Sequence, residues 1–227
     1  MPRLASRSRH SARPKTPRWR RRKDARPEEL VAAALEVFVE RGFAATRLED
    51  VARRAGVTKG TIYLYFDNKD ALFKAVIRQT LVPHIALGEQ LLVEHRGRAA
   101  ELLRELLRKW WELIGQTQLS AIPKLVIAEA GNFPELARFY HQEVVVRGSR
   151  LIGQVLERGI AAGEFRPMDV PSAVRLAWAP LILAVVLRHS VLKCVDESFN
   201  FERYLSLHTD TFLRGIAKSP SGNLTHA

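Results

Sequence analysis

Residues 46–69, TRLEDVARRAGVTKGTIYLYFDNK, constrain the fold more than any other part of the chain. Thr46 and Glu49 have the spacing of a capping box, in which two side chains accept hydrogen bonds from backbone amides at a helix start. Gly56 follows the apolar positions of this first helix, and only glycine takes left-handed backbone angles without steric cost. Thr58 carries a hydroxyl that can cap a second helix. The stretch therefore predicts two short helices joined by a sharp turn.

The second helix, expected over residues 58–66, has two different sides at about 100° per residue. Ile62 and Phe66 share the side expected to pack on the first helix, with Lys59 and Tyr63 on its flank. The opposite side consists of Gly60, Thr61, Leu64 and Tyr65. Such a side suits a DNA major groove, because glycine permits close approach, hydroxyls bond base edges or phosphates, and leucine can touch a thymine methyl. The alternative is that the two tyrosines simply pack at the edge of the folded unit.

Asn68 and Lys69 follow this helix directly. Asn68 is expected to cap a further helix, and Lys69 would then lie in its first turn. A helix N-terminus with a lysine is a suitable phosphate clamp.

These residues resemble the DNA-binding domain of the TetR family of bacterial transcriptional regulators. The resemblance rests on TRLEDVARRAGVTKGTIYLYFDNKDALF and extends back through LVAAALEVFVERGF. It implies that the helix starting near Thr58 enters the major groove. The DNA contacts that it implies, together with those derived above, are Thr46, Arg47, Thr58, Lys59, Gly60, Thr61, Tyr63, Leu64, Tyr65 and Lys69. At the position of Leu64 the family often has a larger aromatic or polar residue.

Most of the positive charge belongs to the N-terminal segment. The chain of 227 residues has a net charge of +12, and residues 1–26 contain eleven Lys or Arg and one Asp. Because this segment has almost no aliphatic residues, we expect a disordered basic arm that either lies along DNA phosphates or only improves solubility. A second disordered tail is expected over residues 219–227.

The rest of the chain has helical periodicity only. Pro27 is expected to begin the first helix, which should end at Gly42, and Pro83 should kink or end the helix that starts near Asn68. We therefore predict an all-α protein of about nine helices. An N-terminal three-helix helix-turn-helix domain (27–82) precedes a larger effector-binding and dimerisation domain (83–218).

The segment VPSAVRLAWAPLILAVVL is apolar on almost every side. Its longest apolar run, residues 176–187, is too short to span a bilayer, so we expect no membrane association. A helix of this kind needs a partner on its outer face, unless it is the central core helix of a monomer. The family resemblance implies that residues 171–192 and 201–216 pair with their symmetry mates. Such a homodimer would place two recognition helices about 34–36 Å apart on a palindromic operator.

Aromatic residues gather in the middle of the chain, where the family resemblance implies an inducer site. The candidate pocket residues are Trp110, Trp111, Glu129, Phe133, Phe139, Tyr140 and Trp178. At most one of the adjacent tryptophans can face inward fully, and core packing explains aromatics at least as well as a ligand. Glu129 would pair with a cationic ligand if it were buried, and would be an ordinary surface residue otherwise.

Sites of other classes are missing from the sequence. The seven histidines are dispersed, the single cysteine rules out an internal disulfide, and no phosphate-binding glycine loop or nucleophile motif is present. We therefore expect no enzyme, no metal and no cofactor. The predicted function is that of a cytoplasmic, nucleoid-associated repressor, released from DNA by a small apolar or cationic inducer. An activator, a regulator without a ligand, and a non-specific nucleic-acid or membrane-surface protein remain alternatives.

Overall fold

The computed structural model describes residues 27–195 and 199–218. The predicted arm 1–26 and tail 219–227 lie outside this range. The described residues form helices, with one isolated bridge between Phe165 and Ala217 and no strand. The all-α prediction is therefore confirmed.

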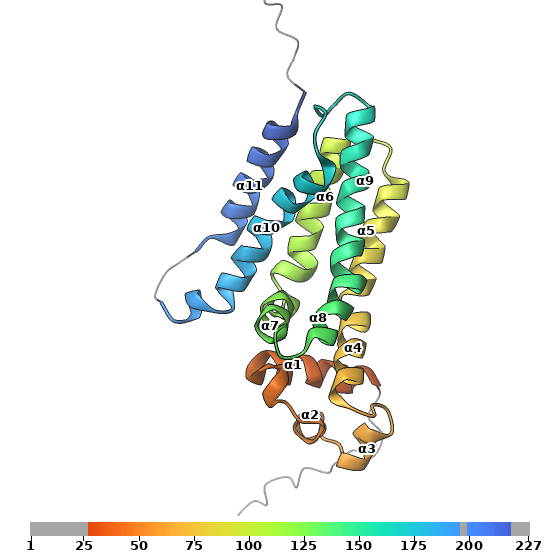
Figure 1. Cartoon of the computed structure of the whole chain (residues 1–227), viewed down its shortest axis with the longest axis vertical. Helices are drawn as coiled ribbons and strands as arrows, with labels where there is room; N and C mark the ends of the chain where they lie inside the picture. The colour runs from red at the N-terminus through yellow and green to blue at the C-terminus, as the bar shows by residue number, and fades with distance from the viewer. Residues whose placement is uncertain (1–26, 196–198, 219–227) are drawn as a thin grey trace, which may run out of the picture.

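Four helices make up one end of the molecule (Figure 1). They are α1 (Pro27–Ala45), α2 (Leu48–Arg54), α3 (Lys59–Tyr63) and α4 (Lys69–Thr80). Gly42 interrupts α1 with a φ of 82°, as expected for the residue that ends the first helix. Gly56 has a φ of 72° between α2 and α3, which confirms the predicted turn.

The remaining helices form the longer part of the molecule (Figure 1). They are α5 (Val82–Glu94), α6 (Ala99–Trp110), α7 (Ile122–Glu129), α8 (Pro134–Tyr140), α9 (Arg147–Ala161), α10 (Val170–Arg188) and α11 (Phe201–Ile216). A π-helical segment, His141–Val146, joins α8 to α9 without a break, so the number of separate helices is close to the predicted nine. Pro83 lies in the first turn of α5, directly after the break that it was expected to cause.

Two groups of buried side chains hold these helices together. The first contains residues of α1 to α4, but it also includes Ile122, Leu125 and Leu136 from α7 and α8. The second joins α6, α9, α10 and α11. Since the first group crosses the expected boundary near residue 82, movement of α7 or α8 must be felt by the N-terminal helices.

Helix α10 belongs to the segment Val170–Lys193, which is long and apolar enough to cross a membrane by length and composition alone. The apolar segment is therefore longer than the run 176–187 on which the sequence-based expectation rested. A single helix of this kind is weak evidence for a span, because core helices pass the same test. Ala177, Leu181 and Val185 of α10 are buried in the second core group.

Candidate nucleic-acid interface and ligand cavity

The helix α3 is shorter than predicted. It ends at Tyr63, and the chain continues in a turn in which the Tyr65 and Phe66 amides both donate to the Ile62 carbonyl. Thr58 is the N-cap as predicted, since its hydroxyl accepts a hydrogen bond from the Thr61 amide at 3.2 Å. The Asn68 cap of α4 is also present, with 2.8 Å between Asn68 Oδ1 and the Ala71 nitrogen.

An apolar and aromatic surface projects from α3 and the turn after it. Leu64 is 83% exposed, and Tyr63 and Tyr65 are each more than two-fifths exposed. Gly60 is exposed as well, and within the described part of the chain a Cβ added there would meet only Thr58 Oγ1, at 3.8 Å. Packing inside the protein therefore does not require glycine at this position, and the space in front of it is open. The two tyrosines are thus only partly covered by the protein.

Two threonines predicted to face DNA are buried. Thr61 is 6% exposed, and its hydroxyl lies 2.9 Å from that of Thr58. Thr46 is 3% exposed and donates its hydroxyl to the Gly42 carbonyl at 2.6 Å. The predicted capping box is therefore wrong. Arg47 occupies the N-cap position of α2 without a side-chain cap, because Thr46 instead satisfies a carbonyl where α1 is interrupted.

Lys69 is not presented as a phosphate clamp. Its ammonium donates to the carbonyls of Phe43 at 2.8 Å and Ala44 at 3.0 Å, and lies 4.5 Å from the centre of the Phe43 ring. The lysine thus satisfies carbonyls at the C-terminal end of α1. Arg47, by contrast, is exposed and makes no ion pair with any residue that the structure describes, so its side chain can reach a phosphate.

Glu49 organises the basic side of α3, a role that sequence reasoning missed. Its Oε1 lies 2.7 Å from Lys59 Nζ and accepts a hydrogen bond from the Tyr63 hydroxyl at 3.3 Å. The hydrogen bond with Lys59 lowers the pKa of Glu49, and the same bond raises the pKa of Lys59. The spacing of Glu49 from Thr46 suggested only a cap, because the packing of α2 on α3 was unknown.

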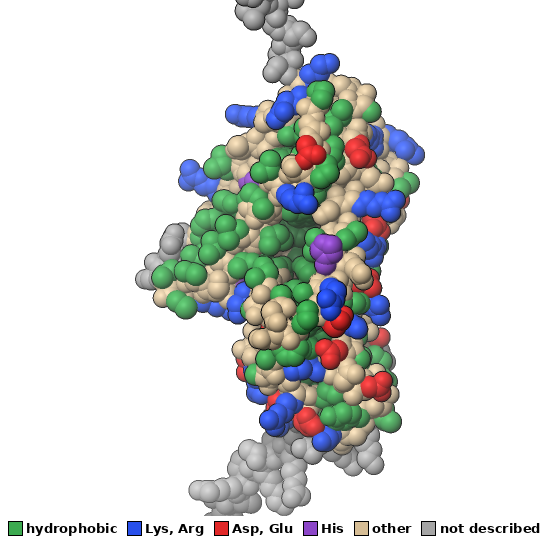
Figure 2. Space-filling view, viewed as in Figure 1, with side chains coloured by type: hydrophobic (Ala, Val, Ile, Leu, Met, Phe, Trp, Pro, Cys, Tyr) green, Lys and Arg blue, Asp and Glu red, His purple; other side chains and the backbone are tan. Residues whose placement is uncertain are grey.

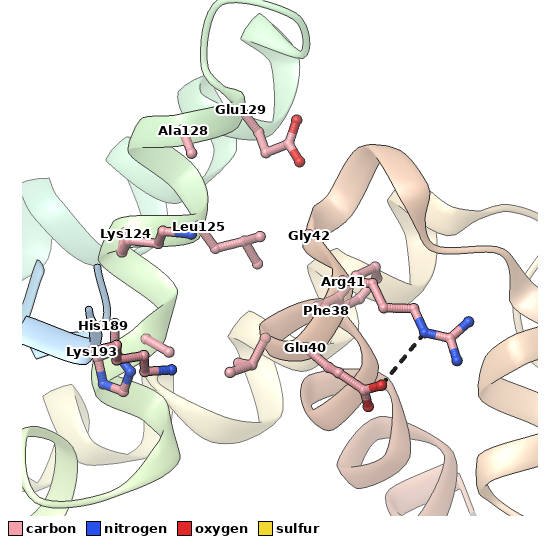
Figure 3. A pocket seen from close by; sticks show the side chains of 12 residues that line it. Phe38, Glu40, Arg41, Gly42, Lys124, Leu125, Ala128, Glu129, His189 and Lys193 are labelled. Carbon is pink, nitrogen blue, oxygen red and sulfur yellow. Dashed lines mark ion pairs between the residues drawn. The ribbon is translucent and has the colours of Figure 1, made fainter. Parts of the chain in front are cut away.

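Glu129 connects α7 to the end of α1. It is only 9% exposed, and its Oε1 accepts a hydrogen bond from the Ala44 amide at 3.0 Å. Figure 3 shows its carboxylate directed toward the Gly42 segment. Phe133 supports the same contact, with its ring 4.8 Å from that of Phe43. Glu129 is therefore not a solvated surface residue, and it lines a smaller cavity beside this contact, not the larger one that holds the aromatic side chains.

A cavity of about 320 Å³ lies beside this contact, between α1 and α7. Figure 3 shows Lys124 on one wall and His189 with Lys193 below it. His189 Nε2 lies 2.7 Å from the Ser120 hydroxyl. Burial, and then the positive charge of Lys193 and its neighbours, lowers the pKa of His189 to about 4.

A larger cavity of about 610 Å³ lies among α5, α6, α7, α9 and α10. Figure 2 shows hydrophobic side chains gathered around a hollow in the middle of one face, with basic side chains and a histidine near its edge. Most lining residues are aliphatic, and three of the predicted pocket residues, Trp110, Tyr140 and Trp178, are among them. The rings of Trp110 and Trp178 meet edge to face at 5.3 Å. This size and composition are typical of small-molecule sites.

The other predicted pocket residues lie elsewhere. Trp111 is buried in the second core group and stacks on Phe201 at 5.6 Å, so only one of the adjacent tryptophans faces the cavity. Phe139 lies beneath Lys74 and Arg78 on α4. Helical periodicity identified inward-facing aromatics, but it could not say which of two internal spaces each would face.

The family model described as "Bacterial regulatory proteins, tetR family" matches residues 30–76. The model "Tetracyclin repressor-like, C-terminal domain" matches residues 93–196. The HTH-type transcriptional regulator RutR of Escherichia coli K12 is 42% identical over 169 residues, covering 68% of this chain and 71% of RutR.

The chain belongs to the TetR family. The fatty acid metabolism regulator protein of Bacillus subtilis is 28% identical over 163 residues, covering 70% of this chain and 82% of that protein. The crystal structure of FadR from the same organism, in complex with stearoyl-CoA, has a TM-score of 0.71 at 23% identity and covers 84% of this chain and 100% of FadR. This TetR-family chain is therefore a DNA-binding transcriptional regulator and not an enzyme.

Proposed function

We propose that the protein is a cytoplasmic homodimeric repressor that binds a palindromic operator through α3 and leaves it when an apolar ligand fills the large cavity. The observation that carries the DNA-binding role is the surface of Tyr63, Leu64 and Tyr65, which stays exposed beside Gly60. Three neighbouring exposed residues of this kind form an apolar surface, and contiguous apolar surfaces mark interaction sites where isolated exposed residues do not.

The exposed residues are proposed to make two kinds of DNA contact. Leu64 supplies an apolar contact of the kind that distinguishes thymine by its methyl group. Arg47, Lys59 and the tyrosine hydroxyls supply phosphate contacts that fix the position of the helix. The buried Thr46 and Thr61 act indirectly, because they hold α2 and α3 in place.

Glu49 sets a limit on non-specific binding. It neutralises Lys59 and holds the Tyr63 hydroxyl while DNA is absent, so a phosphate must displace the carboxylate to engage either group. Since phosphate contacts supply most non-specific affinity, this competition favours sites where base contacts also contribute.

The proposed dimer interface is the outer side of α10 and α11. Leu176, Leu183 and Leu207 are all more than half exposed there. Figure 2 shows the green side chains of this region covering much of the projecting part of the molecule. Pairing of two such surfaces would bury these leucines and relate two α3 helices by a two-fold axis.

Helix α7 connects the large cavity to the N-terminal helices. Pro123, Val126 and Ile127 of α7 line it, while Glu129 at the end of the same helix holds the Ala44 amide. A ligand that prefers one position of α7 would shift the population of DNA-binding conformations. FadR from Bacillus subtilis was crystallised with stearoyl-CoA. That complex supports an elongated apolar ligand for this protein as well.

The DNA-binding role is tested by selecting sites from a randomised duplex library with the full chain. We expect a palindromic consensus, and we expect Leu64→Ala to change the preferred base at one position of each half-site. Val93→Ala is the matched control, because Val93 is an exposed apolar residue on α5, away from α3. Failure to enrich any sequence, or an unchanged consensus for Leu64→Ala, would reject the assignment.

A further inference from the structure

The charge on the walls of the large cavity has one sign. Among the described residues that line it, the ionisable side chains are His84, Lys109, Tyr140, His141 and Arg175, and there is no Asp or Glu. Nearly all the other lining side chains are apolar. An apolar cavity whose only charged groups are basic favours a ligand that combines an apolar body with negative charge.

Lys109 and Arg175 lie beside the two tryptophans of the cavity. Lys109 precedes Trp110 at the end of α6, and Arg175 lies one turn before Trp178 on α10. Both basic residues line the cavity, and each is close in sequence to one of the two rings that meet there.

Neither basic residue has a strong partner of its own. The only ion pair of Lys109 within the described ranges is with Glu105, at 3.9 Å, which is long for a salt bridge. Arg175 donates a single weak hydrogen bond to the Pro171 carbonyl at 3.4 Å. Both cations can thus pair with an anionic group at little cost in existing contacts.

Tyr140 adds a neutral donor. Its hydroxyl makes no hydrogen bond with any residue between 27 and 195 or between 199 and 218, and the residue is partly buried on the cavity wall. Burial raises the pKa of Tyr140, so the hydroxyl keeps its proton and can donate it to an oxygen of the ligand. A donor in this position is stabilised by a ligand that supplies an acceptor.

The described lining of the large cavity has no carboxylate to pair with a cationic ligand. Glu129, the carboxylate that sequence reasoning offered to such a ligand, is not on the cavity wall and already accepts a hydrogen bond from Ala44. We infer, on the basis of the proposed function, that the cavity binds an anionic amphiphile: an apolar chain with a carboxylate or phosphate-bearing head group that pairs with Lys109 and Arg175. The same chemistry is present in a free fatty acid and in its coenzyme A thioester.

The test compares ligands with one chain and different head groups. The full-length protein is titrated with dodecanoate, dodecanoyl-CoA, dodecanol and dodecylamine by isothermal calorimetry, below their aggregation concentrations. We expect one of the two anionic ligands to bind at least about tenfold more tightly than dodecylamine, the ratio that one charge-assisted contact supplies. Tighter binding of the thioester would identify a phosphate-bearing head group, and tighter binding of the acid a carboxylate.

Substitutions test whether Lys109 and Arg175 cause the preference for an anionic ligand. The double substitution Lys109→Met, Arg175→Met keeps apolar stems and should weaken the anionic ligand by about tenfold while leaving dodecanol unchanged. Unchanged dodecanol binding also shows that the variant is folded. Arg150→Met is the control, since Arg150 is an exposed arginine of α9 that does not line the cavity.

Two results would overturn the inference: dodecylamine binding as tightly as the acids, or an unchanged anionic affinity in the double variant. Gel-shift titration on the selected DNA separates this inference from the proposed function. Tight anionic binding that leaves the DNA complex intact would support the ligand class and reject ligand-driven release. Release by dodecylamine alone would reject the ligand class and support release.

Discussion

Replacement of Glu129 tests whether α7 holds the N-terminal helices in place. Glu129→Ala removes the carboxylate that accepts the Ala44 amide at 3.0 Å and empties part of a site that is 9% exposed. A hydrogen bond to a charged group is worth about 1.5–3 kcal/mol. Ala44 lies at the surface, so water can replace part of this bond, and we expect a loss of about 1–2 kcal/mol. For a chain of this size, that corresponds to a fall in Tm of about 3–6 °C.

Thermal unfolding followed by circular dichroism measures this loss. Glu129→Gln keeps an acceptor oxygen and should lose less than half as much. Glu135→Ala is the control, because the ion pair of Glu135 within the described residues is with Arg138 on the exposed side of α8, and surface pairs contribute little. A Glu129→Ala protein as stable as the control would show that the contact does not hold α7 to α1.

Three further predictions concern other parts of the molecule. Removal of residues 1–26 should reduce the slope of log affinity for DNA against log salt concentration, and an identical slope would make the arm a passive extension. Leu207→Glu, on the outer side of α11, should shift the protein toward monomer in sedimentation velocity, whereas Val93→Glu on α5 should not, and equal behaviour would place the interface elsewhere. His189 has a pKa of about 4 in the folded protein, below its usual value of about 6.5, so its neutral form contributes stability above pH 6.5 that is lost as the pH falls toward 4. His189→Gln should therefore lose less urea stability than the wild type between pH 7 and pH 5, and parallel losses would contradict this cause.

Local sequence signals predicted the parts of the structure that depend on local geometry. Gly56 adopts the left-handed angles of the turn, while Thr58 and Asn68 cap the helices that follow them. Each of these outcomes involves residues within three positions along the chain, and backbone conformation over that distance is set mainly by the residues themselves.

Apart from the capping box at Thr46, which failed over four positions, the errors involve residues whose partners lie in other elements. Lys69 bonds to carbonyls about 25 positions away, and Glu129 bonds to an amide 85 positions away. Glu49 meets Lys59 only because α2 packs on α3. The sequence indicates that such side chains are charged, but it does not specify which backbone group or counter-charge packing will bring to them. Binding-site assignments for charged residues are for this reason less secure than helix caps.

In the proposed function, the position of α7 would let a ligand in the large cavity act on the DNA-binding helices. One side of this helix lines the large cavity through Val126 and Ile127, and its end reaches Ala44 through Glu129. Ala44 lies two residues before the buried Thr46, which leads directly into α2 and α3. Because packed cores change between discrete arrangements and do not deform continuously, a small displacement of α7 by a ligand must be accommodated at this contact. If Glu129 carries the coupling, Glu129→Ala should weaken ligand-driven release more than it weakens ligand binding, whereas a purely stabilising contact would leave the ratio of the two unchanged.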